Sequence, residues 1–346
     1  VWVQNGTASP QPLTQSATDQ SAPQVAAGAN GFLAAWNEVA PAGKVAVVRR
    51  FWVSGEPLGE SMIFSESVVG FNPLVASSGD VYLVTVGGWA RRLDARTGEW
   101  IDPKEFMLRD VAIASNGKDF LTLTLETCGF TTCIDARDMT ARGDPLSSYP
   151  VPTPVPVDSV PVIASNGRDY LVAWAQRECG FGCPVSHYRI QAVRIAADGS
   201  KIDILPIALT DFSGFISNPS VSWNGTTYLV TWGDRGLSGA LVSSDGTVQQ
   251  LGSLGDGAFA AAAGSEFLLF RRLISDAGDE WDGKVFGETD WTPIVTRPNL
   301  NFSPPSVASN GASIMLAYDR IADDAGHVGR VFLDPRVFVS RKRAVH

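Results

Sequence analysis

The stretch PVIASNGRDYLVAW, residues 161–174, decides the fold of this 346-residue chain. A short run of β-branched and small residues leads to Asn166-Gly167, and the apolar run YLVAW follows closely. Asn-Gly between two apolar runs is the strongest short-range signal for a two-residue β-hairpin turn with positive φ. The stretch therefore predicts a strand, a two-residue turn and a second strand.

The same hairpin phrase recurs along the whole chain. With Ile163 as the reference position, the frame also fits at Val25, Val75, Ile113, Val221, Ala260 and Val307. The reference positions lie 38 to 58 residues apart, near the roughly 40 to 50 residues of a four-stranded propeller blade. Seven positions further on, the residue is always large and apolar: Phe32, Tyr82, Phe120, Tyr170, Tyr228, Phe267 and Ile314.

These repeats predict one all-β domain over residues 1–346, a seven-bladed β-propeller of four-stranded antiparallel blades. The blades are expected to start near residues 22, 72, 110, 160, 218, 257 and 304. Residues 1–19 have the pattern of a third and a fourth strand without a first hairpin, and the last repeat has little room for a fourth strand. We expect the N-terminal strand to complete the last blade and close the ring. The alternative is that it completes the blade of a neighbouring molecule, which would give a dimer or a fibre.

The phrase PxVASNGxxYLVAW, followed by an ADGS-type turn at Ala197–Ser200, resembles the repeats of secreted bacterial seven-bladed β-propellers. The resemblance covers nearly the whole chain and concerns its architecture. It implies an extracellular or cell-surface module, and it carries over no catalytic residues.

Composition excludes some classes of function. A net charge of −9 and a pI near 4.9 argue against general nucleic-acid binding, which needs clustered Lys and Arg side chains. No apolar run reaches the roughly 18 residues that a transmembrane helix needs. A carbohydrate or a protein is the expected partner, with self-assembly as the alternative.

Four cysteines form two local pairs, Cys128 with Cys133 and Cys179 with Cys183. They predict two disulfides, each closing a hairpin loop. A four-thiolate zinc site is the alternative, but the spacings match the usual zinc motifs poorly. Disulfides indicate an oxidising compartment. Because the chain begins VWVQNGT, with neither Met nor a signal peptide, we expect a processed secreted protein. We expect the extracellular space, the cell surface or the periplasm.

The loops joining second to third strands are long and varied, and we expect ligands to dock on the face that carries them. The candidate ligand-binding aromatic residues are Trp89, Phe130, Phe181, Tyr188 and Trp281; packing of loop against loop is the alternative role. The candidate calcium ligands are Asp276, Asp279, Glu280, Asp282, Asp323 and Asp324. Their spacing matches no standard calcium loop, and a solvated acidic rim is the alternative. No other cofactor is indicated.

The sequence offers little support for an enzyme. Its three histidines, His187, His327 and His346, are scattered, and no nucleophile-elbow, zinc-protease or phosphate-loop motif is present. We therefore predict a binding or structural module. The alternatives are a subunit of an extracellular fibre and a glycan-active hydrolase or lyase that uses carboxylates such as Asp282 and Asp323.

Overall fold

The structure is a computed structural model. It describes residues 2–4, 11–12, 19–41, 43–65, 72–128, 131–142, 147–153, 159–178, 187–213, 219–233, 236–257, 259–273, 280–296, 305–311, 313–321 and 329–338. Backbone alone is described at 2–4, 11–12, 65, 128, 131, 147–153, 295–296, 319–321 and 329–338. Every regular element in these ranges is a β-strand. Within them there is no helix long and apolar enough to span a membrane.

The first three sheets in chain order are each built from four consecutive strands. Sheet I consists of β3 (Gln20–Gly28), β4 (Gly31–Ala40), β5 (Gly43–Phe51) and β6 (Pro57–Ser65). Sheet II consists of β7 (Leu74–Ser77), β8 (Val81–Val86), β9 (Trp89–Asp94) and β10 (Phe106–Met107). Sheet III consists of β11 (Ala112–Ser115), β12 (Phe120–Cys128), β13 (Thr131–Met139) and β14 (Ser147–Thr153).

The next three sheets repeat this order. Sheet IV consists of β15 (Val162–Ser165), β16 (Tyr170–Arg177), β17 (Tyr188–Ile195) and β18 (Ile207–Ala208). Sheet V consists of β19 (Ser220–Trp223), β20 (Tyr228–Gly233), β21 (Leu237–Val242) and β22 (Val248–Gly255). Sheet VI consists of β23 (Phe259–Ala263), β24 (Glu266–Leu273), β25 (Glu280–Val285) and β26 (Thr292–Thr296).

Sheet VII joins the two ends of the chain. Its C-terminal strands are β27 (Ser306–Ser309), β28 (Ser313–Ile321) and β29 (Gly329–Phe338), and its N-terminal strands are β1 (Trp2–Gln4) and β2 (Gln11–Pro12). Both N-terminal strands pair antiparallel with β29, with Val3 opposite Val337 and Gln11 opposite Leu333.

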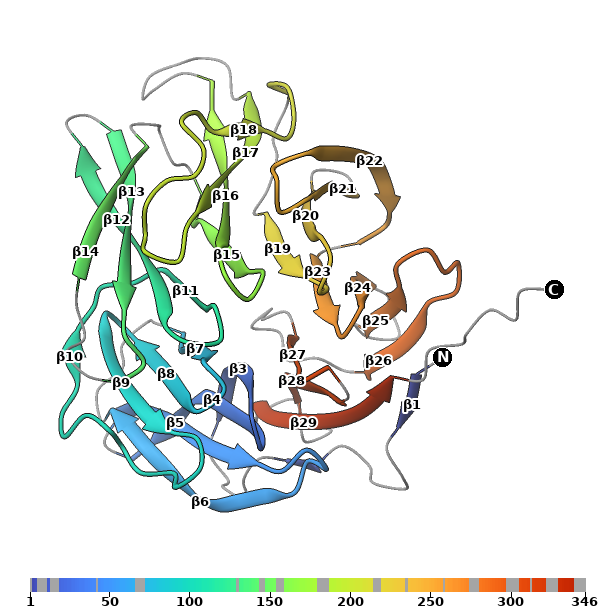
Figure 1. The fold of residues 1–346 in the computed structure, drawn as a ribbon. Coiled ribbons are helices and arrows are strands. Elements are labelled where there is room, and N and C mark those ends of the chain that lie inside the picture. The colour runs from blue at the N-terminus through green and yellow to red at the C-terminus, as the bar shows by residue number, and fades with distance from the viewer. Residues whose placement is uncertain are drawn as a thin grey trace.

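The sheets are arranged around a common centre, with the first strand of each sheet innermost (Figure 1). Neighbouring first strands are in contact from β3 through β27, and β27 also contacts β3. Sheets I to VI are six four-stranded antiparallel blades of a β-propeller. The prediction of an all-β propeller with such blades is confirmed.

The turns at the Asn-Gly pairs differ from the prediction. Ser165 pairs with Tyr170 across β15 and β16, so the turn contains the four residues 166–169 instead of two. Asn166 Oδ1 accepts hydrogen bonds from the backbone N–H groups of Arg168, at 2.9 Å, and Asp169, at 2.7 Å, while Gly167 has a φ of 88°. The prediction of a two-residue turn was wrong because the asparagine side chain caps a longer loop, as aspartate and asparagine commonly do in turns.

Tyrosines at the large apolar position of the repeat join neighbouring blades. Each phenol donates a hydrogen bond to a backbone carbonyl in the first hairpin of the preceding blade, and burial raises the pKa of all three phenols. The bonds run from Tyr82 to Gly31 at 3.4 Å, from Tyr170 to Asp119 at 3.4 Å and from Tyr228 to Asp169 at 3.2 Å. The repeated aromatic residue therefore supplies both apolar surface and, where it is tyrosine, an inter-blade hydrogen bond.

Arginines on third strands form a second set of links between blades. Arg92, 3% exposed, forms a two-pronged ion pair with Asp102. The same guanidinium donates to the carbonyl of Thr140 in the next sheet at 3.0 Å. Arg194 repeats the arrangement with Asp203 in its own sheet and Ser244 in the next.

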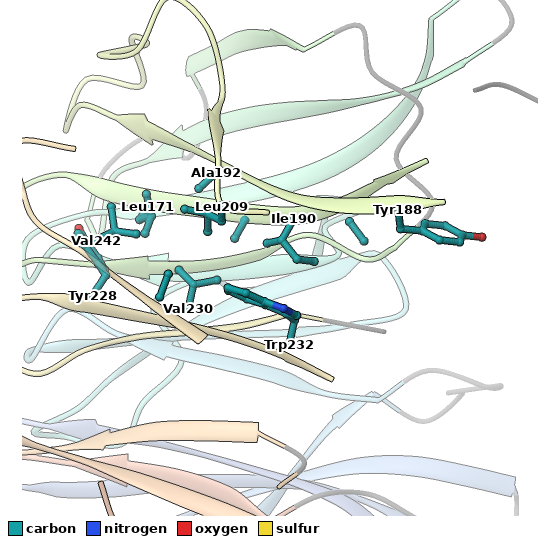
Figure 2. Packing of buried hydrophobic residues seen from close by; sticks show 12 residues of the cluster. Leu171, Tyr188, Ile190, Ala192, Leu209, Tyr228, Val230, Trp232 and Val242 are labelled. Atoms are coloured by element: carbon teal, nitrogen blue, oxygen red, sulfur yellow. The ribbon is translucent and has the colours of Figure 1, made fainter. Parts of the chain in front are cut away.

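The core consists of apolar clusters between adjacent sheets. In the seam between sheets IV and V, Leu171 and Ile190 pack toward Val230 and Trp232 (Figure 2). In the described residues, a comparable apolar cluster lies between every other pair of consecutive sheets from I to VII. One more cluster joins sheets VII and I. Second strands are buried on both faces, which explains their continuous apolar runs.

Candidate functional site

Many of the candidate residues lie outside the described parts of the chain. Phe130 and Phe181 belong to this group, as do Asp276, Asp279, Asp323, Asp324, His327 and His346. The ligand-binding and calcium-binding roles predicted for the residues in these loops stay predictions.

The three described aromatic candidates have different environments. Trp281 is 6% exposed, and its ring packs edge-on against Phe259 at a centroid distance of 5.8 Å. Tyr188 is 7% exposed, and its hydroxyl accepts a hydrogen bond from Arg177 Nη2 at 2.9 Å. Trp89, at the start of β9, is 46% exposed. Of these three, only Trp89 offers an open ring to a ligand, whereas Trp281 and Tyr188 contribute to the packing of their sheets.

The two described calcium candidates, Glu280 and Asp282, both lie on β25. Asp282 is 3% exposed, and its Oδ2 accepts hydrogen bonds from Arg271 Nε at 2.9 Å and Nη2 at 2.7 Å. An arginine on the carboxylate competes with a metal ion for the same oxygen. Among the described residues, no group of three or more His, Cys, Asp or Glu side chains is arranged to hold a metal.

One cysteine and one histidine among the candidates are described with their side chains. Cys133 is 5% exposed and disulfide-bonded. The side chains of the other three cysteines lie outside the described residues, so the predicted pairing stays a prediction. His187 Nδ1 lies 2.9 Å from Glu178 Oε2 at an exposed position, where it meets no second metal-binding side chain among the described residues.

A cavity of about 440 Å³ opens on the side of the molecule where first strands begin and second strands end. This volume is within the range of ligand pockets, about 300 to 1,000 Å³. Its lining comes from the entrances of sheets II, III and IV and from the β8–β9 turn. The lining residues are Asn72, Leu74, Thr85, Gly87, Gly88, Arg109, Asp110, Val111 and Val160.

The repeat explains why these residues meet. Asn72, Asp110 and Val160 each stand three positions before the reference residue of their own repeats. Because the first strands surround the centre of the molecule (Figure 1), equivalent positions of three successive repeats come to one place. The cavity is therefore a feature of the propeller's inner rim on the face predicted to bind ligands.

Asp110 is the carboxylate of this cavity. Its Oδ2 accepts a hydrogen bond of 2.6 Å from the Thr85 hydroxyl. Its Oδ1 is buried and has no hydrogen-bond partner in the described part of the chain. Burial raises the pKa of the carboxyl from 3.8 to about 6, although the hydrogen bond from Thr85 acts in the opposite direction. Burying a carboxylate oxygen without a hydrogen-bond donor costs free energy. Because nearly all buried polar atoms in proteins have a partner, this oxygen calls for an explanation.

The backbone beside Asp110 is in an uncommon conformation. Arg109 has a φ of 54°, one of two positive values among the described non-glycine residues. The backbone N–H groups of Leu108 and Arg109 both donate to the carbonyl of Gly88, at 2.8 and 3.0 Å. At Gly88, φ is 85° and an added Cβ would lie 3.4 Å from Arg109 Cα. Strained backbone of this kind clusters at ligand sites, and here it places Asp110 against Thr85.

Sequence reasoning missed Asp110, Arg109 and the Gly87-Gly88 pair. The signal was present in the repeat frame, since the position of Asp110 is occupied elsewhere by Ala22, Asn72, Val160, Asn218, Gly257 and Pro304. Asp110 is the one carboxylate in this set and would have indicated the site. The prediction instead took its candidates from the loops that follow second strands.

The site is suited to binding. It combines an apolar wall, one carboxylate and the amide side chain of Asn72. Glycosidases of the usual kind need two carboxyl groups at a defined separation. Among the described residues that line the cavity, Asp110 is the sole carboxylate.

Comparisons with known proteins agree with the architecture. No protein-family model matches the sequence, and no curated protein matches it either. The polysaccharide lyase Uly1 is similar in structure, with a TM-score of 0.54, 9% identity and coverage of 92% of this chain and 90% of that one. The fold is that of a β-propeller.

Two further structures extend this result. The β-propeller domain of Cps50 (Swd1) from Myceliophteria thermophila has a TM-score of 0.51 at 12% identity, and the match covers 93% of this chain and all, 100%, of that one. An acylaminoacyl peptidase from Pyrococcus horikoshii has a TM-score of 0.56 at 9% identity, with 93% of this chain matching 52% of the peptidase. At such low identities the likeness concerns the fold alone.

Proposed function

We propose that the chain is a seven-bladed, ring-closed β-propeller that acts outside the cytoplasm as a binding module. Its ligand, a carbohydrate or a protein, docks on the face that carries the β8–β9 turn. The observation that carries this proposal is the cavity of about 440 Å³ lined by Asp110. It is of ligand size, it lies at the inner rim, and it is lined by a carboxylate, one of whose oxygens is buried without a donor among the described residues.

Contacts between sheets VII and I support a seventh blade and a closed ring. The backbone N–H of Val25 on β3 donates to Ser306 Oγ on β27 at 3.0 Å. Ala308 and Met315 of sheet VII belong to the same buried cluster as Trp36 of sheet I. These contacts resemble the seams between consecutive blades.

The disulfide at Cys133 supports an oxidising location, since disulfides persist in secreted, periplasmic and cell-surface proteins. The antiparallel pairing of β1 and β2 with β29 of the same chain favours a self-contained molecule over strand exchange into a fibre. A hydrolase or lyase is not favoured, because Asp282 is bound to Arg271 and Asp110 has no second carboxylate beside it in the described lining.

Retention of labelled protein on glycan and protein arrays tests the proposal. Wild-type protein is expected to be retained on a subset of spots, and Asp110→Asn is expected to lose that retention. Asp290→Asn is the matched control, because it makes the same change at an exposed residue in the connection between β25 and β26. Absence of wild-type retention on both arrays would refute a binding module, and undiminished retention of Asp110→Asn would place binding at another surface.

A further inference from the structure

The chemistry of the Asp110 cavity indicates a class of ligand, and this assignment rests on the proposed function of the site. The cavity has an apolar wall formed by Leu74, Val111 and Val160. Asp110 adds a carboxylate to this lining, and its Oδ1, which is itself buried, has no donor in the described part of the chain. A complementary ligand must supply an apolar body and one strong hydrogen-bond donor.

The missing donor is best supplied by a cation. A carboxylate is an acceptor only, and hydrogen bonds between charged groups are roughly twice as strong as neutral ones. The Thr85 hydroxyl already donates its single proton to Oδ2 at 2.6 Å. Rotation about the carboxyl torsion only exchanges the two equivalent oxygens, so a ligand cation pairs with the charge that the carboxylate presents on the side of Asp110 that lines the cavity.

The shape and polarity of the lining favour an alkyl chain over a sugar. A pyranose presents hydroxyl groups around its whole ring, and each needs a partner when it is buried. Besides Asp110 and Thr85, whose proton is already donated, the described lining offers one neutral polar side chain, Asn72. A lysine side chain has four methylene groups, which lie favourably along apolar surface, and one ammonium at the end.

The charge of the molecule favours the same ligand. A net charge of −9 attracts basic partners over long range. Arg109 is the other charged residue in the described lining, and its side chain is exposed. In the described part of the chain, Asp110 forms no ion pair with Arg109 or with another basic side chain.

We propose that the Asp110 cavity binds a lysine side chain of a basic protein partner, with the lysine ammonium paired to the Asp110 carboxylate and its methylene groups against Leu74, Val111 and Val160.

Titration calorimetry with small probes tests this proposal directly. The probes are N-acetyl-lysine N-methylamide, n-butylammonium, the neutral analogue n-butanol, and galactose and glucose as sugar probes. The lysine derivative and butylammonium are expected to bind, and butanol and the sugars to bind at least tenfold more weakly. Because the carboxylate must be ionised, affinity is expected to rise about tenfold per pH unit below pH 6 and to level off above it.

Three variants assign the binding to this cavity. Asp110→Asn is expected to weaken binding of the lysine derivative at least tenfold. Val160→Trp is expected to do the same by filling the cavity from an exposed wall residue, 54% accessible in the wild type, without changing the carboxylate. Asp290→Asn is expected to bind as the wild type does. Circular dichroism of each variant establishes that it is folded.

Several results would overturn the inference. Unchanged lysine affinity in Asp110→Asn would show that the carboxylate is not the acceptor. Binding of butylammonium without the lysine derivative would exclude a protein side chain as the source. A sugar that binds in place of the amines would also overturn it, and yet would leave the proposed binding module intact. Failure of the module itself is a separate result, namely no wild-type retention on either array.

Discussion

Replacing Asp110 by asparagine is expected to stabilise the ligand-free protein at neutral pH. The folded-state pKa of this carboxyl is raised from 3.8 to about 6 by burial, so the folded protein holds this proton more tightly than the unfolded chain does. The favourable contribution is complete below pH 3.8 and is lost as the pH rises through about 6. At neutral pH the wild type therefore carries an ionised, buried and incompletely bonded carboxylate that the variant lacks.

The size of this effect follows from the two pKa values. The difference between 3.8 and about 6 corresponds to about 3 kcal/mol at 1.36 kcal/mol per pKa unit. The gain of Asp110→Asn is thus expected to approach about 3 kcal/mol at pH 7.5 and to be under about 1 kcal/mol at pH 4. Asparagine has the same shape, and its carbonyl oxygen still accepts the hydrogen bond from Thr85.

Denaturant unfolding of the wild type and the variant at the two pH values measures the gain, with Asp290→Asn as the control that changes an exposed carboxylate. A lower free energy of unfolding for Asp110→Asn at pH 7.5 would be incompatible with a destabilising carboxylate. So would a gain of equal size at both pH values, because either result would mean that the carboxylate is satisfied in the folded state. Stability gained where a ligand contact is lost is a common property of binding sites.

Three further predictions concern the scaffold, and each is measured by denaturant unfolding. Trp281→Ala is expected to cost about 3–5 kcal/mol because the ring is buried, whereas Trp89→Ala, at a 46% exposed residue, is expected to cost under about 1 kcal/mol; similar costs would contradict the assigned roles. Tyr228→Phe is expected to cost about 1 kcal/mol through loss of its inter-blade hydrogen bond, and no loss would show that this bond is dispensable. Asp102→Ala is expected to cost about 3–5 kcal/mol because the buried guanidinium of Arg92 loses its carboxylate counter-ion, and a cost under about 1 kcal/mol would mean that water replaces the carboxylate.

The fold was predictable because the sequence pattern of one hairpin recurs along the chain, and each copy predicts the same local structure. Any single copy, such as the one around Ile163, is ambiguous, but the set specifies short strands, tight turns and a large residue that packs between blades. The turn itself was predicted wrongly, because the pair Asn166-Gly167 is compatible with both a two-residue and a four-residue loop. The side-chain bonds of Asn166 to Arg168 and Asp169 decide between them, and they depend on where the strands end.

The site was predictable only in part. The ligand-binding face was inferred from the length of its loops. The sequence does not reveal which candidate residues are buried and which are exposed. Trp281 and Asp282 lie in a carboxylate-rich stretch that reads as an exposed loop, but both belong to β25 and are buried. Asp110 looks unremarkable in its own segment and becomes significant only beside Thr85 and the Gly88 turn, which another repeat contributes.

Titration of the Asp110 carboxyl by carbon NMR shows whether this group is a buried acceptor that lacks a donor. Protein labelled with carbon-13 at aspartate side chains is titrated without ligand, and the resonance is assigned by its absence in Asp110→Asn. A pKa of about 6 is expected, falling when butylammonium is added. A pKa at or below the ordinary aspartate value of about 3.9 would be the opposite result, because it would mean that the carboxylate already has its partners.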